Sequence, residues 1–559
     1  MNRGLCLRGA VLLALVLGVL VPILSGFWVT GMASFGLLPA IGANKPGLGA
    51  WALLLDQPGF ATSLRLTLVT GFAATGLSLA VAAGAVAFLH GRVRAEVLSP
   101  FLAVPHAALA IGLAFLLAPS GWIARAVLGG GVPPDWATVN DPWGGALILG
   151  LMAKEVPFLV LMMLSALGQI PARAQIAAGR ALGYGPGVVW VSVILPQLWP
   201  LLRLPVAVVL AFSLSVVDVA LILGPSNPPT LAVGVTRWFA SPDTALLLPA
   251  SAGAVVQAGV VALGLAVLWA GERVVARIGR ARLRLGRRGG RGGPVLVALA
   301  GMAALLMSLA TLALVGLAVW SFAFRWPWPV VLPESWSLRF WMTPGNWLAA
   351  AGQSLAIGAA ATGAALLLAV AWLEGEDRGG MARARWAEAL IYLPLILPQI
   401  AFLYGLNVQL LRAGISPGFG AVVWGHVLFV FPYVMIALSD PWRRLDPGHM
   451  RSAAALGAGT WRRLWAVKLP LLIRPILTAA AVGFAVSVAL YLPTLFLGGG
   501  RIATLTTEAV TLSSGADRRV LGVLATLQAA MPLMAFALAG FVPALLHRNR
   551  RGMTGGLPA

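Results

Sequence analysis

The sequence predicts an all-α, polytopic membrane protein with about twelve transmembrane helices, arranged as two parallel repeats of six. Three observations carry this prediction. The composition is that of an integral membrane protein, since 60% of the 559 residues are hydrophobic and only 10% are charged. Apolar runs of 18 or more residues recur without the alternation that is typical of strands. Finally, one segment of the chain occurs twice in the same register.

Each transmembrane helix needs about 20 mostly apolar residues, and twelve stretches meet this requirement. The first follows Arg3 and Arg8 and resembles a signal peptide. Its apolar run is long for a signal core, and the second set begins with an equivalent helix, so we expect it to be retained. The expected spans lie at 9–31, 62–89, 98–118, 144–168, 200–224, 247–270, 295–321, 349–373, 387–411, 418–439, 472–497 and 519–546.

The repeated segment comprises residues 177–196 and 451–470, which read AAGRALGYGPGVVWVSVILP and RSAAALGAGTWRRLWAVKLP. Both place Ala-Leu-Gly and Leu-Pro in one register, 274 residues apart, as 177 is from 451. The same separation relates Leu223-Gly224 to Leu497-Gly498. A constant separation indicates that one membrane unit was duplicated. Because each unit has an even number of spans, both copies keep one orientation about a pseudo-twofold axis along the membrane normal.

Positive charge predicts the orientation and the division of the chain. With the N-terminus inside, the cytoplasmic segments hold 28 of the 39 Lys and Arg residues, as the enrichment of these residues in cytoplasmic loops requires. Both termini and both copies of the repeated segment are then cytoplasmic. The net charge of +22 needs no nucleic-acid partner. We expect a first half at 1–270, a flexible arginine-rich linker at 271–293 and a second half at 294–559.

Local signals in the repeated segment predict a short helix, a turn and a second helix. Alanines favour the first helix, and Gly183 or Gly457 suits its end because glycine accepts the left-handed conformation found there. Pro196 and Pro470 suit the start of the next helix, where a missing N–H costs little. A plain amphipathic connector is the alternative, and the occurrence of two copies in one register disfavours it.

The segment resembles the EAA loop of permease subunits of binding-protein-dependent ABC importers, whose consensus is E-A-A-x3-G-x9-I-x-L-P. The resemblance covers essentially the whole chain, with loops at 171–198 and 445–472. It implies that each loop docks on a cytoplasmic ATPase subunit. Ala177 and Arg451 replace the consensus Glu, so any salt bridge made by that Glu is absent or replaced. The implied docking residues are Ala177, Ala178, Gly179, Gly183 and Pro196, with Arg451, Ser452, Ala453, Gly457 and Pro470.

The resemblance also implies partners and a location. A single chain with both halves is similar to the fused permeases of the thiamine and iron(III) branch. The stretches 154–158 and 215–230 look most like fused permeases assigned to thiamine transport. The implied setting is the bacterial inner membrane. The implied partners are cytoplasmic ATPase subunits, as two copies, and a periplasmic solute-binding protein.

Three ionisable residues lie deep within expected spans: Lys154, Glu155 and Asp218. Such groups cost about 2.5–3.5 kcal/mol each on insertion scales and normally face an interior or a wet cavity. One interpretation puts them on the translocation pathway; the other is a structural Lys–Asp or Lys–Glu pair between spans four and five. Asp218 aligns with Leu492, so the pathway is expected to be chemically lopsided. Its excess negative charge favours a cationic solute such as thiamine.

The residue patterns expected for ATP hydrolysis and for metal binding do not occur in this sequence. No G-x4-G-K-[ST] motif surrounds any of the three lysines, Lys45, Lys154 and Lys468, so we expect ATP hydrolysis on a partner and no enzymatic activity here. The five histidines show no metal spacing and Cys6 is alone, so we expect neither a metal site nor a cofactor. The alternatives to an importer permease are an ion-gradient-driven secondary transporter and a membrane scaffold or enzyme. Iron(III) and polyamines are the alternative substrates.

Overall fold

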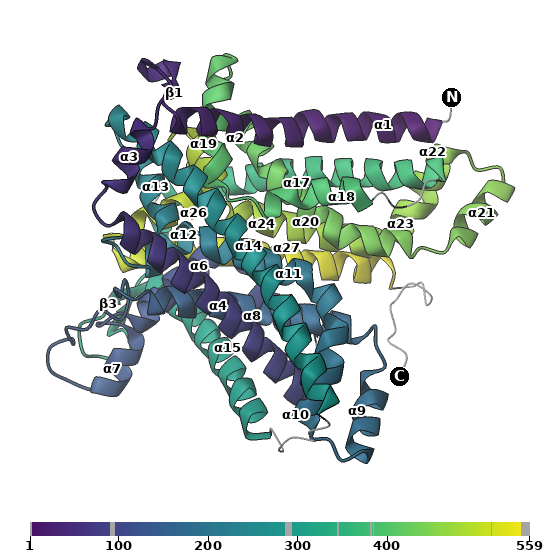
Figure 1. Cartoon of the computed structure of the whole chain (residues 1–559), viewed down its shortest axis with the longest axis horizontal. Coiled ribbons are helices and arrows are strands. Elements are labelled where there is room, and N and C mark those ends of the chain that lie inside the picture. Colours follow the sequence, from purple (N-terminus) through teal and green to yellow (C-terminus); the bar gives the residue numbers. More distant parts are fainter. Residues whose placement is uncertain are drawn as a thin grey trace.

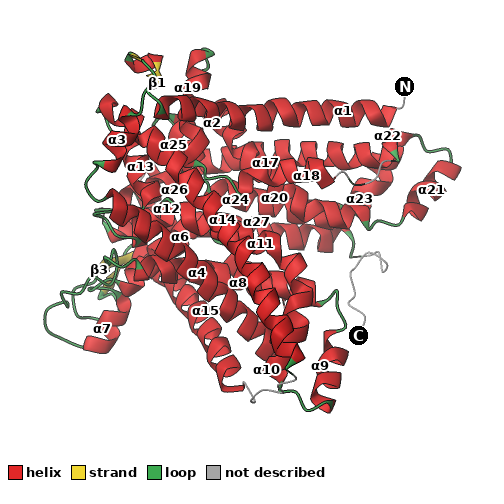
Figure 2. Ribbon diagram, in the orientation of Figure 1, coloured by secondary structure: helices red, strands yellow, loops and turns green. Residues whose placement is uncertain are grey.

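Helices make up nearly all of the structure, which confirms the predicted fold class (Figures 1 and 2). The computed structural model describes residues 3–89, 95–285, 293–343, 346–380, 383, 385–515 and 517–548. Within these residues, ten helices are long and apolar enough to cross a membrane. Two further helix pairs bend by 93° and 75°, and they bring the total to twelve if each pair counts as one span.

The first half runs from α1 to the long helix α14. Its helices are α1 (Arg3–Leu15), α2 (Val21–Ser34), α3 (Gly49–Leu55), α4 (Phe60–Leu89), α5 (Ala95–Ala103), α6 (His106–Leu117), α7 (Trp122–Leu128), α8 (Gly145–Leu167), α9 (Ala172–Ala181), α10 (Pro186–Val189), α11 (Leu195–Ser215), α12 (Asp218–Leu223), α13 (Leu231–Phe239) and α14 (Leu247–Arg284).

The second half repeats this order of long and short helices. Its helices are α15 (Gly293–Phe322), α16 (Arg339–Met342), α17 (Asn346–Gly379), α18 (Arg385–Tyr392), α19 (Ile400–Arg412), α20 (Phe419–Arg443), α21 (Pro447–Ala455), α22 (Thr460–Arg463), α23 (Leu469–Leu471), α24 (Ile473–Ala489), α25 (Leu492–Gly498), α26 (Leu505–Leu512) and α27 (Arg518–Leu546). Two antiparallel strand pairs follow the first helices of the halves: β1 (Leu37–Leu38) with β2 (Ala43–Asn44), and β3 (Ala323–Arg325) with β4 (Ser335–Trp336).

The two halves exchange their first helices. Helices α1 and α2 pack against α17 and α19 of the second half, whereas α15 packs against α4 and α6 of the first half. Two glycines permit these crossings. A Cβ at Gly405 would lie 2.1 Å from the main-chain oxygen of Gly26, and a Cβ at Gly112 would lie 2.6 Å from that of Ala313. Gly112 and Gly405 occupy matching positions in the two halves, so the same close approach is used twice.

Some expected spans are not single helices. The stretch 98–118 is broken between α5 and α6 at Pro105, and 387–411 is broken between α18 and α19 near Pro398, because proline disfavours helix at the preceding residue. The stretches 200–224 and 472–497 also break, before α12 and α25. Asp218 therefore begins a short separate helix and does not lie inside span five, which corrects its expected position.

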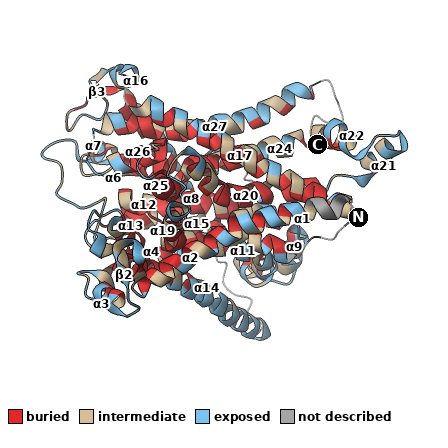
Figure 3. Ribbon diagram, turned by 90° about the horizontal axis from the view of Figure 1, so that it is seen from above, coloured by how far each residue is buried: buried red, intermediate tan, exposed pale blue. Residues whose placement is uncertain are grey.

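The linker between the halves is helical over its first part. Helix α14 runs without interruption to Arg284, so the flexible strap expected to begin at 271 was wrong for that stretch. Residues 286–292 of the linker lie outside the described part of the chain. The far end of α14 is largely exposed, whereas buried residues concentrate at the centre, where both halves contribute to one apolar core (Figure 3).

Candidate functional site

Both copies of the repeated segment form the predicted helix, turn and second helix. Helix α9 and helix α21 each end two residues before a glycine in the left-handed region, Gly183 at φ 79° and Gly457 at φ 78°. A π-helical turn follows at matching places, Trp190–Ile194 and Leu464–Lys468. The sequence did not indicate these turns. The start of α1 and both short helices lie toward the right of Figure 1, opposite β1 and β3.

The small residues of the two segments are mostly exposed. Ala177, Ala178, Arg451 and Ser452 are exposed, and so are Gly183, Gly457 and Pro196, while Gly179, Ala453 and Pro470 are half-buried. Position 179 favours glycine, because a Cβ there would lie 2.4 Å from the side chain of Val189. Helix α9 buries Ala172 and Ile176 and α21 buries no residue, so one face of α9 and most of α21 are exposed within the described chain.

Two leucines on this surface were missed by the sequence reasoning. Leu182 is 65% exposed and Leu456 is 88% exposed, and both follow the end of their helix directly. They are matched across the duplication, because each precedes the glycine of the Ala-Leu-Gly motif. An apolar residue held at the tip of both copies is the signal that could have identified them.

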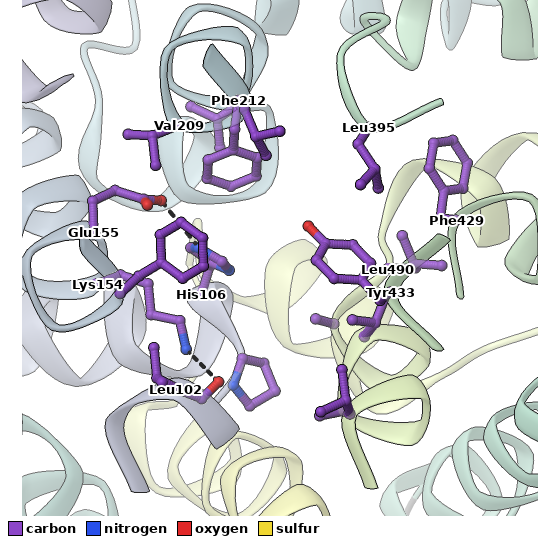
Figure 4. Close-up of a pocket in the computed structure, with 18 of the residues that line it drawn as sticks. Leu102, His106, Lys154, Glu155, Val209, Phe212, Leu395, Phe429, Tyr433 and Leu490 are labelled. Atoms are coloured by element: carbon purple, nitrogen blue, oxygen red, sulfur yellow. Dashed lines mark hydrogen bonds and ion pairs between the residues drawn. The ribbon is translucent and has the colours of Figure 1, made fainter. Parts of the chain in front are cut away.

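A cavity of about 550 Å³ lies between the two halves (Figure 4). The first half lines it with the junction of α5 and α6, with α8, and with the ends of α11 and α12. The second half lines it with residues 394–399, with α20 and with α24 and α25. The cavity thus lies where the helices of both halves are broken.

The three ionisable residues singled out in the sequence all line this cavity. Lys154 is 6% exposed, and its ammonium donates to the main-chain oxygens of Phe101 (2.7 Å) and Leu102 (2.9 Å), and also to that of Val104. These are carbonyls at the end of α5, where a cation is favoured by the helix dipole. Neither the Lys–Asp nor the Lys–Glu structural pair is formed in the described chain; the cation caps a helix instead.

A histidine that the sequence reasoning set aside completes this polar wall. Nε2 of His106 lies 3.5 Å from Oε1 of Glu155, and its ring packs at 4.6 Å from that of Phe212 (Figure 4). His106 opens α6 directly after Pro105, so the break in the helix turns it toward the cavity. A histidine beside a proline in an apolar span was the signal available in the sequence.

The opposite wall is aromatic and apolar. Tyr433 lies across from Lys154 and His106, beside Leu490 and Phe429 (Figure 4). Tyr491 also lines the cavity. Asp218 is matched by Leu492 of the second half, which lines the cavity as well. Among the described lining residues, the lysine, the histidine and both carboxylates thus come from the first half and the tyrosines from the second.

No group of three or more His, Cys, Asp or Glu side chains that could hold a metal ion occurs among the described residues. The cavity offers carboxylates, an imidazole and phenol rings, with no built metal centre. Such a lining offers groups that can bind and orient a solute.

A duplicated bundle of membrane helices, with a cavity between its halves and a matched pair of exposed short helices, defines a membrane transport protein. The chain belongs to the permease subunits of binding-protein-dependent ABC importers. Residues 379–549 match the family described as binding-protein-dependent transport system inner membrane component. The chain is 33% identical to the inner membrane ABC transporter permease protein YnjC of Escherichia coli K12 over 514 residues, which cover 90% of this chain and 92% of that protein.

Shorter relatives match part of the chain. The molybdenum transport system permease protein ModB of Mycobacterium tuberculosis H37Rv is 32% identical over 213 residues, 35% of this chain and 76% of that protein. The putrescine transport system permease protein PotI of Escherichia coli K12 is 27% identical over 188 residues, 32% and 66% respectively. The family works with an ATPase and a periplasmic binding protein, and the chain is a multi-pass inner membrane transport subunit. Membership also removes the ion-gradient-driven secondary transporter as an interpretation.

Proposed function

We propose that this permease carries a small cationic solute from the periplasm to the cytoplasm, with both termini on the cytoplasmic side. The observation that carries the proposal is the charge of the cavity wall. Glu155 and Asp218 both face the cavity, while the ammonium of Lys154 is already held by main-chain oxygens. The two carboxylates are therefore the charged groups proposed to bind the solute, whereas the lysine is already hydrogen-bonded to the protein main chain.

The aromatic wall favours the same class of solute. A cation held over the face of a tyrosine or phenylalanine ring gains about 0.5–2 kcal/mol, more where water is excluded. Tyr433, Tyr491 and Phe429 offer such rings in the same cavity as the carboxylates. An anion such as molybdate would meet two carboxylates and no uncommitted cation among the described lining residues, apart from His106 beside Glu155.

Within this class we propose thiamine, or a related cationic ring compound, as the substrate. Thiamine carries a fixed positive charge on one flat ring and a second aromatic ring, which suits a wall of two carboxylates and a facing wall of phenol rings. The cavity of about 550 Å³ is within the range of roughly 300–1,000 Å³ usual for small-molecule sites. Putrescine, the substrate named for PotI, is the second candidate because the carboxylates would also hold a diamine.

Coupling to ATP hydrolysis is proposed to run through α9 and α21. The family requires an ATPase, and we propose two copies, each docked on one short helix through the small residues that the EAA resemblance names. Leu182 and Leu456 add an exposed apolar anchor at each helix end. Closure of the ATPases would then move the two halves as rigid bodies and switch access to the cavity.

The test is uptake into proteoliposomes that contain the chain with its ATPase and binding protein. We expect ATP-dependent uptake of labelled thiamine, reduced by Asp218→Asn and by Glu155→Gln, with no uptake of molybdate. Glu334→Gln is a matched control, since Glu334, just before β4, pairs with Arg325 at the end of β3, and both side chains are exposed. Uptake of putrescine but not thiamine would overturn the assignment of thiamine as the substrate. Normal uptake by both cavity variants would overturn the cation site.

A further inference from the structure

Seven charged side chains gather where α17 ends beside the segment that contains α21. They are the ion cluster Glu374, Glu376, Asp377, Arg378, Glu388, Arg443 and Lys468. Glu374, Glu376, Glu388 and Lys468 are each between 3% and 7% exposed. Sequence reasoning did not single out this cluster, because its members lie on four different elements. Buried ions persist only when they are paired, so the cluster constrains how those elements sit together.

Lys468 makes the first link of the cluster. Its ammonium lies 2.9 Å from Oε2 of Glu374 and also contacts Asp377. The other oxygen of Glu374 accepts a 2.8 Å bond from Nε of Arg378. Lys468 closes the π-helical turn after α21, whereas Glu374, Asp377 and Arg378 all lie on α17. The chain that leaves α21 is thus tied to α17 by ion pairs.

Arg443 makes the second link, on the other side of α21. Its Nη2 donates to Glu376 of α17 at 2.9 Å and to Glu388 of α18 at 2.5 Å. The neighbouring Trp442 donates from Nε1 to Asp377 at 2.8 Å. Arg443 ends α20, just before α21 begins at Pro447. Both chain segments that flank α21 are therefore held by the same group of carboxylates.

The cluster also reaches the cavity. Glu388 lies on α18, which ends at Tyr392 and leads directly into the broken stretch that carries Pro394, Leu395 and Gln399. All three of these residues line the cavity. A movement of α21 that shifts Arg443 would therefore act on α18 and through it on the cavity wall.

Among the described residues, the first half shows no comparable group of ion pairs. At the separation of 274 residues, Gln169 takes the place of Arg443 and Ile194 takes the place of Lys468. Ile194 is fully buried in an apolar cluster with Trp190 and Leu198. Within the described chain, the π-helical turn after α9 is thus held by apolar packing, whereas the matching turn after α21 ends in Lys468 and its ion pairs.

Some bonds of the cluster are unmade. Oε1 of Glu376, Nη2 of Arg378 and Nη1 of Arg443 are buried without a hydrogen-bond partner in the described chain. A buried unpaired atom of a charged group is costly. These three atoms can form new bonds if the helices shift, and a two-state connection between rigid elements needs such exchange of partners.

We propose that this ion cluster transmits the movement of α21 to α18 and the cavity wall, a connection that has no counterpart of the same kind among the described residues of the first half. The inference rests on the proposed function, since it requires an ATPase that acts on α21. Arg443 and Lys468 are positioning residues in it. They touch neither the solute nor ATP.

The test measures solute imported per ATP hydrolysed in proteoliposomes with the ATPase and binding protein. We expect Arg443→Gln and Lys468→Met to hydrolyse ATP at a near wild-type rate while importing at least about fivefold less solute per ATP, the lower bound of typical coupling between sites. The double variant Arg443→Gln with Glu388→Gln should lose less than the sum of the two single variants, because Arg443 and Glu388 share one ion pair, although each also has a partner of its own, Glu376 and Arg383. Arg325→Gln, which breaks an exposed pair at the other end of the molecule, is the control.

The amount of folded complex is measured for each variant by size-exclusion chromatography. An unchanged ratio of solute to ATP overturns the inference, and so does a defect that matches the loss of folded protein, because either result makes the cluster merely structural. Additive losses in the double variant also overturn it. Absence of ATP-dependent import by the wild-type complex refutes the proposed function itself, and the inference falls with it.

Discussion

The side-chain amide of Gln257 donates a 2.9 Å hydrogen bond to the main-chain oxygen of Leu214, where α11 is about to end. In the second half, the matching main-chain oxygen at the helix break is also hydrogen-bonded, but through one additional residue. Gln528 donates to the hydroxyl of Thr506 at 2.6 Å, and that hydroxyl donates to the main-chain oxygen of Val488. Leu214 and Val488 are 274 residues apart, so the break is conserved in the duplication while its hydrogen-bond partner differs.

Gln257→Leu is expected to destabilise the protein by about 1–3 kcal/mol, since the oxygen of Leu214 would be buried without a donor. The measurement is thermal unfolding in detergent, followed by the loss of a monodisperse peak. Gln528→Leu should have an effect of similar size by freeing Thr506. No shift in either variant would show that water takes over these carbonyls.

Gly405→Ala is expected to disturb the crossing of α2 and α19, because the new methyl group would meet the main chain of Gly26. Overpacking of this kind costs about 1–3 kcal/mol, read as a lower unfolding temperature. Gly363→Ala is the matched control in α17, where a Cβ would meet no atom within 4 Å. There the substitution should be neutral or stabilise the helix by up to about 1 kcal/mol. Equal effects at both positions would contradict the helix exchange.

Lys154→Met is expected to destabilise the junction of α5 and α6, since hydrogen bonds to a charged group contribute about 1.5–3 kcal/mol. Lys154→Arg should recover part of this loss by keeping a cationic donor. Unfolding temperature and solute affinity are measured on the same samples. A Lys154→Met variant with normal stability and altered solute affinity would return this lysine to the pathway and remove its role as a helix cap.

Leu182→Ala and Leu456→Ala are expected to weaken binding of the ATPase with little effect on folding. Exposed substitutions usually change stability by no more than about 0.5 kcal/mol, whereas an interface anchor contributes more than about 1 kcal/mol. Binding of the purified ATPase to immobilised permease reads out the difference. Leu332→Ala serves as the control, because Leu332 is 58% exposed on the loop between β3 and β4. Unchanged ATPase binding in both variants would exclude the two leucines as anchors.

Much of the candidate site was predictable because its signals are local. The Gly183 and Gly457 turns follow from the tolerance of glycine for positive φ, and the cost of ions in a membrane singled out Lys154, Glu155 and Asp218. The role of Lys154 as a helix cap was not predictable, since it depends on carbonyls about 50 residues away that are freed by the break at Pro105. The ion cluster was missed for the same reason: Glu374, Glu388, Arg443 and Lys468 meet only after four elements have packed.

By itself, the sequence determined that the protein is helical, lies in the membrane and is built from two copies of one unit, because hydrophobic length and internal repetition act along the chain. Only the tertiary structure decided which groups face the cavity and which are already paired. That depends on contacts between distant elements, such as Tyr433 of the second half across from His106 of the first, and on where each helix breaks. Burial and pairing are properties of the packed molecule, and two halves with nearly the same scaffold therefore carry different chemistry.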